Sequence, residues 1–206
     1  MKATDIAHYL QNNPQFFEDH AEMLAEVTLP HPYGGRTISL SERQLLALRE
    51  KNKGLEKKLH DMVEAAQDND ALQHKVHQFS CSLFGADTLP GMTETITRNL
   101  REIFSVPHVA LHVWQIQPPS AEILAFTDQQ AQAVCAHHAL HDTLQWFGED
   151  AAHLRSFSYL PLRVGEQSIG LLVLASEDAQ RFYPEMGTLF LQRIAEIVSC
   201  ALRPHL

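Results

Sequence analysis

The sequence lacks the long apolar runs and the export leader that would direct a protein into or across a membrane. No apolar run approaches the ~20 residues that a helix needs to span a bilayer. The first residues, 1–5, also lack the basic-then-apolar pattern of an export signal. With 206 residues, of which 45% are hydrophobic, the chain can bury one core and carry an attached arm. We therefore expect a cytoplasmic protein with no membrane association.

Paired cysteines and an excess of positive charge are also missing. The three cysteines, Cys81, Cys135 and Cys200, lie far apart and form no C-x-x-C pair, which argues against a disulfide framework and a structural zinc site. The net charge of -9, with a pI near 5.8, would repel the phosphates of a nucleic acid. We therefore expect free thiols and no direct contact with nucleic acid.

Catalytic motifs are absent as well. The sequence contains no Walker loop, paired-carboxylate motif, Ser/His/Asp signature or Rossmann glycine pattern. His137 and His141, four residues apart on a predicted helix, could face one metal ion. A metal site needs three or four ligands, however, and Cys135 would point in a different direction from His137. We therefore predict no catalytic residues, no metal site and no enzymatic activity, and the sequence specifies no cofactor.

What the sequence does contain is one long amphipathic helix, predicted over residues 39–84. Its first residues, 39–42, read Ser-Leu-Ser-Glu, a capping box in which the serine and glutamate side chains bond free backbone amides. No proline interrupts the run, and apolar residues repeat every seven positions, which is the pattern of a coiled coil. The predicted dimer interface contains Leu45, Leu48, Asn52, Leu55, Leu59 and Met62.

This seven-residue repeat predicts a homodimer. A helix of about 45 residues extends roughly 65 Å, which is too long for one small domain to cover. Asn52 at a central position favours a parallel, in-register pair, because the two amides meet only when the helices are aligned. Asn69 and Gln73 weaken the repeat further along. We therefore place the coiled-coil dimerisation helix at residues 39–69 and a separate domain at residues 70–206.

Residues 1–38 are predicted to form a short helical N-terminal arm. Thr4 can begin a first helix that ends before Asn13-Pro14, and a second helix carries Phe16 and Phe17. A turn-rich stretch at residues 29–35 ends the arm. A segment of this size forms no core alone, so its apolar residues need a partner surface. Two interpretations stay open: packing on the long helices of the dimer, or docking of another protein.

The remaining residues alternate between helical and strand periodicity, which predicts a mixed domain with both kinds of element. Gly165-Glu166 separates two apolar strands and predicts a hairpin. The predicted helices cover residues 70–84, 90–104 and 184–202, the predicted strands cover 109–116, 123–126, 157–164 and 168–176, and helical periodicity covers 128–147.

The end of the chain resembles a GAF domain, a small-molecule-sensing relative of PAS. The resemblance rests on residues 159–162 (Tyr-Leu-Pro-Leu), 169–176 (Ile-Gly-Leu-Leu-Val-Leu-Ala-Ser) and 181–182 (Arg-Phe), a series that recurs at the end of GAF domains. It implies an α+β fold in which an antiparallel sheet carries helices on both faces. Preceded by the long coiled-coil helix and the short helical arm, this is the fold class that we expect.

The N-terminal half narrows the resemblance to one bacterial family. Residues 9–17 (Tyr-Leu-Gln-Asn-Asn-Pro-Gln-Phe-Phe), 29–31 (Leu-Pro-His) and 39–44 (Ser-Leu-Ser-Glu-Arg-Gln) resemble the family catalogued as domain of unknown function 484. Its members combine an arm, a long helix and a GAF-like domain, and no activity is established for them. Their genes often lie beside a gene for a tyrosine recombinase, which suggests a protein partner for this chain.

The GAF resemblance also implies a ligand site. In GAF domains one face of the sheet packs on the terminal helices, and the other closes over a ligand with the crossover segment. The more polar face of the strand at 109–116, the hairpin and the crossover then supply the ligand-binding candidates His112, Trp114, Cys135, His138 and Ser158. A cavity filled by the domain's own side chains, with Trp114 packed in the core, is the alternative.

We expect a homodimeric GAF-like regulatory module that binds a small molecule or a partner protein. The alternative is a ligand-free adaptor that recruits a partner through its arm. Some GAF proteins use a cysteine to reduce free methionine sulfoxide. A third and weaker hypothesis is therefore a thiol-dependent reductase with Cys135 as its nucleophile. Nothing in the sequence places a base or a resolving cysteine beside it.

Overall fold

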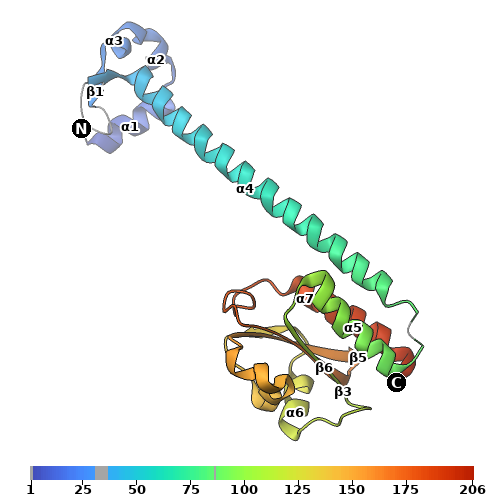
Figure 1. Cartoon of the computed structure of the whole chain (residues 1–206). Helices are drawn as coiled ribbons and strands as arrows, with labels where there is room; N and C mark the ends of the chain where they lie inside the picture. The colour runs from blue at the N-terminus through green and yellow to red at the C-terminus, as the bar shows by residue number, and fades with distance from the viewer. Residues whose placement is uncertain (1, 31–36, 86) are drawn as a thin grey trace. The chain divides into compact units, whose positions relative to one another are not determined.

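A computed structural model describes residues 2–30, 37–85 and 87–206 (Figure 1). The chain divides into two compact units, Met1–Gln67 and Asp68–Leu206. The helix α4 (Leu40–Ser82) continues through this division without a break. No helix in the described ranges combines the length and the apolar character needed to cross a membrane.

The first unit begins with three short helices and a small hairpin. The break expected at Asn13-Pro14 is present, because the first helix ends at Asn12 and the second starts at Gln15. The predicted turn at 29–35 falls mainly on residues 31–36, which lie outside the described residues. The elements are α1 (Ala3–Asn12), α2 (Gln15–Asp19), α3 (Ala21–Glu26), β1 (Thr28–Pro30) and β2 (Thr37–Ser39), and the two strands pair antiparallel.

The long predicted helix is confirmed as α4, which begins at Leu40 rather than at the expected cap. Ser39 belongs to β2, and its side chain lies outside the described residues. Gly54 lies within the helix and costs about 1 kcal/mol relative to alanine, which neighbouring helical residues offset. The helix ends near Gly85, whose φ of +123° suits a residue without a side chain.

The second unit is built on a four-stranded antiparallel sheet with strand order β3-β6-β5-β4. The predicted hairpin is confirmed, with Gly165 at φ +63° in its turn. Gly170 is required where the strands meet, since a Cβ there would lie 2.5 Å from the carbonyl oxygen of His112. The strands are β3 (His108–Val113), β4 (Val134–Ala136), β5 (Ser156–Val164) and β6 (Gln167–Ser176).

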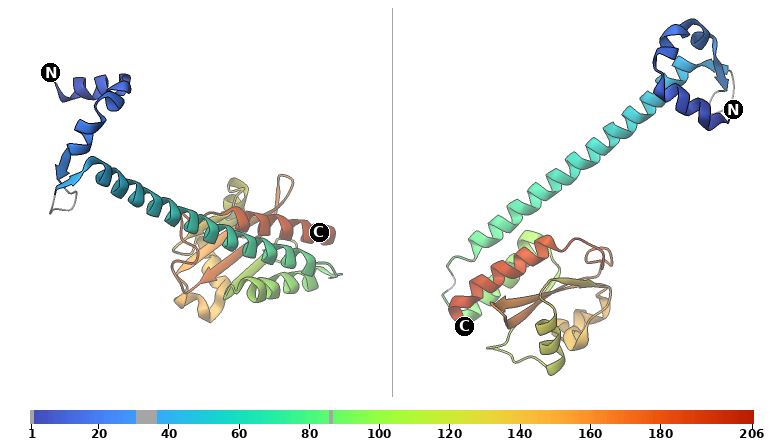
Figure 2. Two further views of the ribbon diagram at one scale, coloured as in Figure 1. Left: turned by 90° about the horizontal axis from the view of Figure 1, so that it is seen from above. Right: turned by 180° about the vertical axis from the view of Figure 1, so that it is seen from behind.

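Helices cover both faces of this sheet, as the GAF resemblance implies (Figure 2). On one face, which we call the helix face, the last turns of α4 pack with α5 (Leu89–Phe104) and α7 (Leu189–Leu202). On the other, the crossover face, lie α6 (Ala121–Gln129) and the 3₁₀ segment η1 (His141–His153). Phe79 and Leu83 anchor α4 in the helix-face core.

Two predictions for the crossover segment are wrong. Residues 123–126 form part of the helix α6 rather than a strand, and the Ser120 hydroxyl accepts a hydrogen bond from the Ile123 amide at its start. The stretch 128–147 is not one helix, because its first two residues end α6, the strand β4 follows, and the helical segment η1 begins only at His141. The final helix also starts at Leu189 rather than near residue 184. Short apolar runs fit both helical and strand periodicity, so their contacts with the sheet determine which element they form.

Candidate functional site

The crossover face carries the first two predicted ligand residues, His112 and Trp114. The His112 ring stacks on Trp146 of η1, with centroids 3.6 Å apart and planes within 9°. Burial lowers the pKa of His112, so the neutral imidazole is favoured in this stack. Trp114 donates a hydrogen bond from Nε1 to the Ser168 hydroxyl over 3.1 Å. Both side chains already have partners within the domain.

Aromatic side chains fill the space between the sheet and the crossover. The fully buried Tyr159 contacts the rings of Phe126 and Phe157. Its hydroxyl accepts a hydrogen bond from the Leu140 amide over 2.8 Å and lies 3.2 Å from the Thr143 hydroxyl. Burial raises the pKa of Tyr159, and these two hydrogen bonds oppose the rise. The domain's own side chains therefore fill this part of the crossover face.

Cys135 and Ser158 lie on the opposite face of the sheet. They pair in register on β4 and β5, and Cys135 packs in the helix-face core with Leu160 and Leu162. Their contact lacks the geometry of a normal hydrogen bond, so the buried Ser158 hydroxyl has no hydrogen-bond partner among the described residues. Burial raises the pKa of the Cys135 thiol more than the neighbouring Ser158 lowers it. A thiol that is 7% exposed with a raised pKa is a weak nucleophile at neutral pH.

The remaining candidate, His138, is exposed beyond the end of β4. The five predicted ligand residues are therefore divided among the crossover face, the helix face and the surface. His137 and His141 do not share a helix, and His141 instead lies 3.6 Å from the Glu122 carboxylate. Among the described residues, no three His, Cys, Asp or Glu side chains gather in a way that could hold a metal ion.

A cavity that the sequence did not indicate lies at the edge of the sheet. Its volume is about 680 Å³, and Trp114, Leu124, Gln167, Ser168 and Arg203 contribute to its lining. Of these only Trp114 was a sequence candidate. An apolar wall with a few amide, hydroxyl and guanidinium groups suits a small polar organic molecule. No alternation along β6 marks Ser168, which is itself buried and begins the buried run of that strand.

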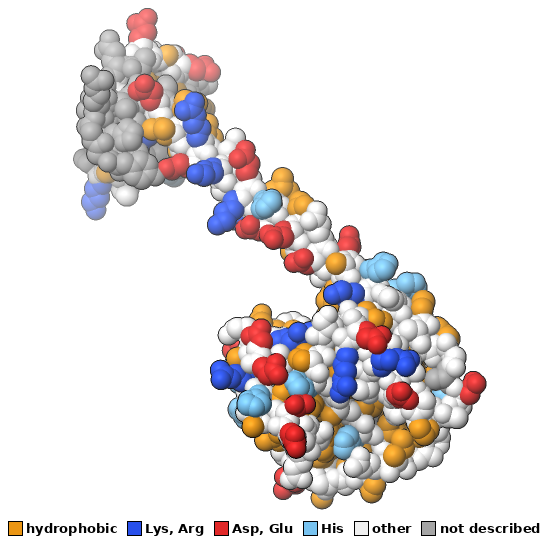
Figure 3. Space-filling model, viewed as in Figure 1, with side chains coloured by type: hydrophobic (Ala, Val, Ile, Leu, Met, Phe, Trp, Pro, Cys, Tyr) orange, Lys and Arg blue, Asp and Glu red, His pale blue; other side chains and the backbone are white. Residues whose placement is uncertain are grey.

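In the part of the chain that the structure describes, the predicted dimer residues on α4 are exposed. Leu59 is 63% exposed and Met62 is 70% exposed, and Leu45, Leu48 and Leu55 are exposed as well. Figure 3 shows apolar side chains alongside charged ones on this part of α4. Exposed leucines repeated along one helix face are typical of a seam that another helix covers.

The comparisons agree with the arrangement of arm, long helix and sheet. The pattern of the family described as "Protein of unknown function, DUF484" matches residues 1–206. The chain belongs to the DUF484 family. The family resemblance of the sequence is thereby confirmed over the whole chain.

Relatives of this DUF484 protein extend over most of its length. The uncharacterised protein YigA of Salmonella typhimurium is 23% identical over 205 residues, covering 92% of this chain and 86% of that protein. YigA of Escherichia coli K12 is 24% identical over 212 residues, with the same coverage. Among solved structures, the GAF domain of a phosphoenolpyruvate-protein phosphotransferase from Coxiella burnetii covers 65% of this chain and 93% of its own, at 12% identity and a TM-score of 0.50. The GAF-like fold is confirmed.

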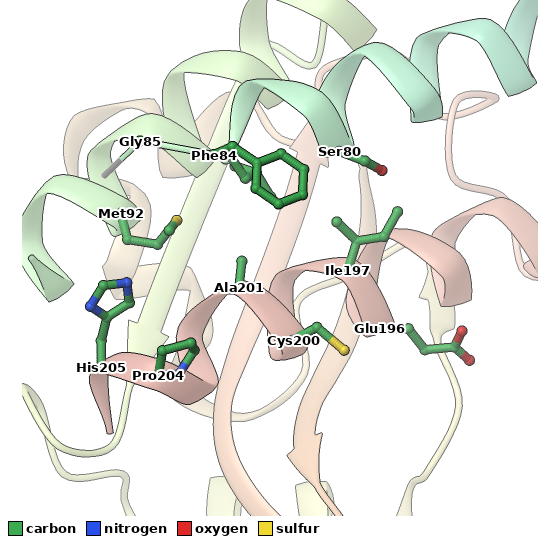
Figure 4. A pocket seen from close by; sticks show the side chains of 11 residues that line it. Ser80, Phe84, Gly85, Met92, Glu196, Ile197, Cys200, Ala201, Pro204 and His205 are labelled. Atoms are coloured by element: carbon green, nitrogen blue, oxygen red, sulfur yellow. The ribbon is translucent and has the colours of Figure 1, made fainter. Parts of the chain in front are cut away.

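A second concave site in the DUF484 chain lies on the helix face, between the end of α4 and the end of α7 (Figure 4). We call it the terminal groove. Its volume is about 470 Å³, and its lining is almost wholly apolar. Ser80, Leu83 and Phe84 line it from the α4 side, and Ile197 and Cys200 line it from α7. The sequence gives no signal for this groove, at whose edge Phe84 is 85% exposed.

Proposed function

We propose that this DUF484 protein is a homodimeric regulatory adaptor that acts by binding rather than by catalysis. In this proposal α4 pairs two copies, and the N-terminal arm docks a partner protein. The observation that carries it is the leucine seam on α4, which is exposed among the described residues. The packed crossover face supports an adaptor over a ligand sensor, because Tyr159 and its aromatic neighbours occupy that space.

The seam supplies enough apolar surface to hold two chains together. Each buried leucine contributes about 1.5–3 kcal/mol, and the seam offers four leucines and Met62 from each copy. Asn52 lies between Leu48 and Leu55 on the seam and supports a parallel, aligned pair. Parallel pairing places the two arms at the same end of the coil.

The arm offers the surface for a partner protein. Tyr9, Phe17 and Met23 are exposed, and none of the residues of α1 and α2 is buried. Phe16 orders the aromatic group by edge-to-face contacts with Tyr9 and Phe17. Aromatic and methionine side chains of this kind are typical of protein-docking surfaces. A tyrosine recombinase, which the family resemblance suggests, is the first partner to test.

Sedimentation of the intact chain tests the pairing. We expect a dimer at micromolar concentration. Leu59→Lys should weaken association at least tenfold, because it places a charge in the seam and removes the burial of one leucine side chain from each chain. The matched control is Lys57→Glu, two residues away and turned outward from the seam, which should leave the dimer intact. A monomeric intact chain would overturn the proposal.

A second candidate function is small-molecule sensing at the cavity of about 680 Å³ beside Trp114. The hydrogen bond from Trp114 to Ser168 favours it, because it fixes an aromatic wall and a hydroxyl in one place. A metabolite screen by thermal shift should then find compounds that raise the melting temperature of the intact chain. Ser168→Ala should reduce that shift, and Ser82→Ala, remote from the cavity lining, should preserve it. Flat responses across the screen would leave the adaptor as the better account.

A further inference from the structure

The cavity beside Trp114 lies where several separate segments of the domain meet at one end of the sheet. Its wall includes residues that follow β3, a residue of α6, and residues of the hairpin between β5 and β6. The 3₁₀ turn η2 (Arg203–His205), which follows α7, contributes Arg203. The volume of about 680 Å³ falls within the range of about 300–1,000 Å³ that small-molecule sites occupy.

Arg203 gives this cavity a positive charge that no acid in the lining balances. Among the described residues, the lining contains neither an Asp nor a Glu side chain. In the same described ranges, no Asp, Glu or C-terminal carboxylate oxygen lies within 4.0 Å of the Arg203 guanidinium. The chain as a whole carries a net charge of -9, so the charge of this lining is opposite to that of the protein. An anion is therefore the ligand that the cavity favours.

Ser168 supplies a second hydrogen-bond donor to the same cavity. Its hydroxyl accepts the Trp114 Nε1–H over 3.1 Å, so the hydroxyl hydrogen stays available. Ser168 is 8% exposed, and within the described part of the chain its hydroxyl donates to no acceptor. A buried donor without an acceptor costs free energy that an oxygen of a ligand would recover. The hydroxyl and the guanidinium thus both require an acceptor on the ligand.

The rest of the wall fits an apolar body. The hydrogen bond to Ser168 holds the Trp114 indole in place at the cavity. Leu124 is 40% exposed and Leu206 is 44% exposed, although both contribute to the lining. A ligand with a hydrocarbon body would remove this apolar surface from water.

We infer that the cavity beside Trp114 binds an organic monocarboxylate with an apolar body. Arg203 pairs with the carboxylate, because its planar guanidinium matches the two carboxylate oxygens. Ser168 donates to an oxygen of the same ligand, and Trp114 contacts its body. One guanidinium balances one negative charge, so a monocarboxylate fits better than a phosphate. This inference rests on the second candidate function, small-molecule sensing, and names the class of its ligand.

Two matched compounds, biphenylacetate and its neutral isostere biphenylacetamide, test the inference on the intact chain. The chain has two tryptophans, and Trp146→Phe assigns their indole N–H signals in proton–nitrogen NMR spectra. The acid should shift the Trp114 signal and leave the signal of Trp146, which is stacked on His112, in place. The amide should bind at least about tenfold more weakly than the acid, because it forms no charge-assisted pair with Arg203.

Substitution of the arginine separates charge recognition from apolar binding. Arg203→Gln should weaken binding of the acid at least about tenfold and leave binding of the amide unchanged. The matched control Arg193→Gln, an exposed arginine of α7 outside the cavity lining, should keep the wild-type preference for the acid.

The outcomes distinguish this inference from the functions on which it depends. Equal affinities for acid and amide would overturn the monocarboxylate class and leave small-molecule sensing at this cavity in place. Unchanged affinity for the acid in Arg203→Gln would overturn it in the same way. If neither compound shifts the Trp114 signal, the inference fails, whereas the homodimer is decided separately by sedimentation.

Discussion

The two faces of the sheet bury side chains of different chemistry. The helix face is almost wholly aliphatic, with leucine, isoleucine and valine from β5, β6 and α7 around Phe79. The crossover face combines Phe157, Tyr159 and Trp146 with an imidazole and several hydroxyl groups. An aliphatic core needs only close packing, whereas every polar group on the second face needs a partner. The helix face is therefore held mainly by close packing, and the crossover face adds hydrogen bonds and ring contacts that hold the crossover segment in place.

The largest predicted effect lies on the helix face. Phe79→Ala should lower the free energy of unfolding of the domain by about 3–5 kcal/mol, because the ring is fully buried and its removal leaves a cavity. Urea denaturation followed by circular dichroism measures this loss. Lys57→Ala, on the same helix but exposed and turned outward from the seam, should change domain stability by less than about 0.5 kcal/mol and serves as the control. Equal effects of the two substitutions would contradict the assignment of α4's last turns to the core.

An intermediate effect should mark the polar chemistry of the crossover face. Tyr159→Phe keeps the ring but removes the acceptor for the Leu140 amide, which should cost about 1–3 kcal/mol in urea denaturation. Tyr183→Phe, at an exposed position, is the matched control and should be nearly neutral. A neutral Tyr159→Phe would mean that the two faces differ in shape but not in their need for hydrogen bonds.

The sequence predicted the regular parts of the fold well, because their signals are long or doubly supported. The 43 residues of α4 carry a sustained heptad, and the hairpin strands carry continuous apolar runs around Gly165. The predictions for the crossover segment were wrong because residues 123–126 and 128–140 are short apolar runs that fit neither helical nor strand periodicity decisively. Their structure is set by pairing with β5 and by packing on β6, which are contacts distant in sequence.

The predictions for the candidate site show the same difference between regular strands and the short, ambiguous crossover. His112 and Trp114 lie on the face opposite the terminal helices, because the alternation along β3 fixes their side. The sequence predicted a helix at Cys135, whereas the structure places Cys135 in the strand β4. Its register with Ser158 directs both side chains to the helix face of the sheet. A shift of one residue reverses the face of a strand, so local pattern alone could not locate them. The cavity beside Trp114 and the terminal groove depend on segments that meet only in the folded chain.

The smallest predicted effect is a pH dependence that belongs to the crossover face. Burial lowers the pKa of His112 below its ordinary value of 6.5. Above that value the ring is neutral in both folded and unfolded chains, so it contributes no pH dependence. As the pH falls below 6.5, the unfolded chain binds the proton first, and the folded state loses stability until the pH reaches the lowered pKa.

Urea denaturation between about pH 8 and about pH 5 should therefore show a steeper loss of stability toward acid for the wild type than for His112→Gln. His153→Gln, at an exposed position, is the control. The fluorescence of Trp146, on which the ring stacks, should change only as the pH falls toward the lowered pKa of the folded ring, and in the wild type alone. Parallel profiles of unfolding free energy against pH for the wild type and His112→Gln would mean that protonating the stacked imidazole costs no more than protonating one in water. The contrast between the two faces would then rest on hydrogen bonds alone.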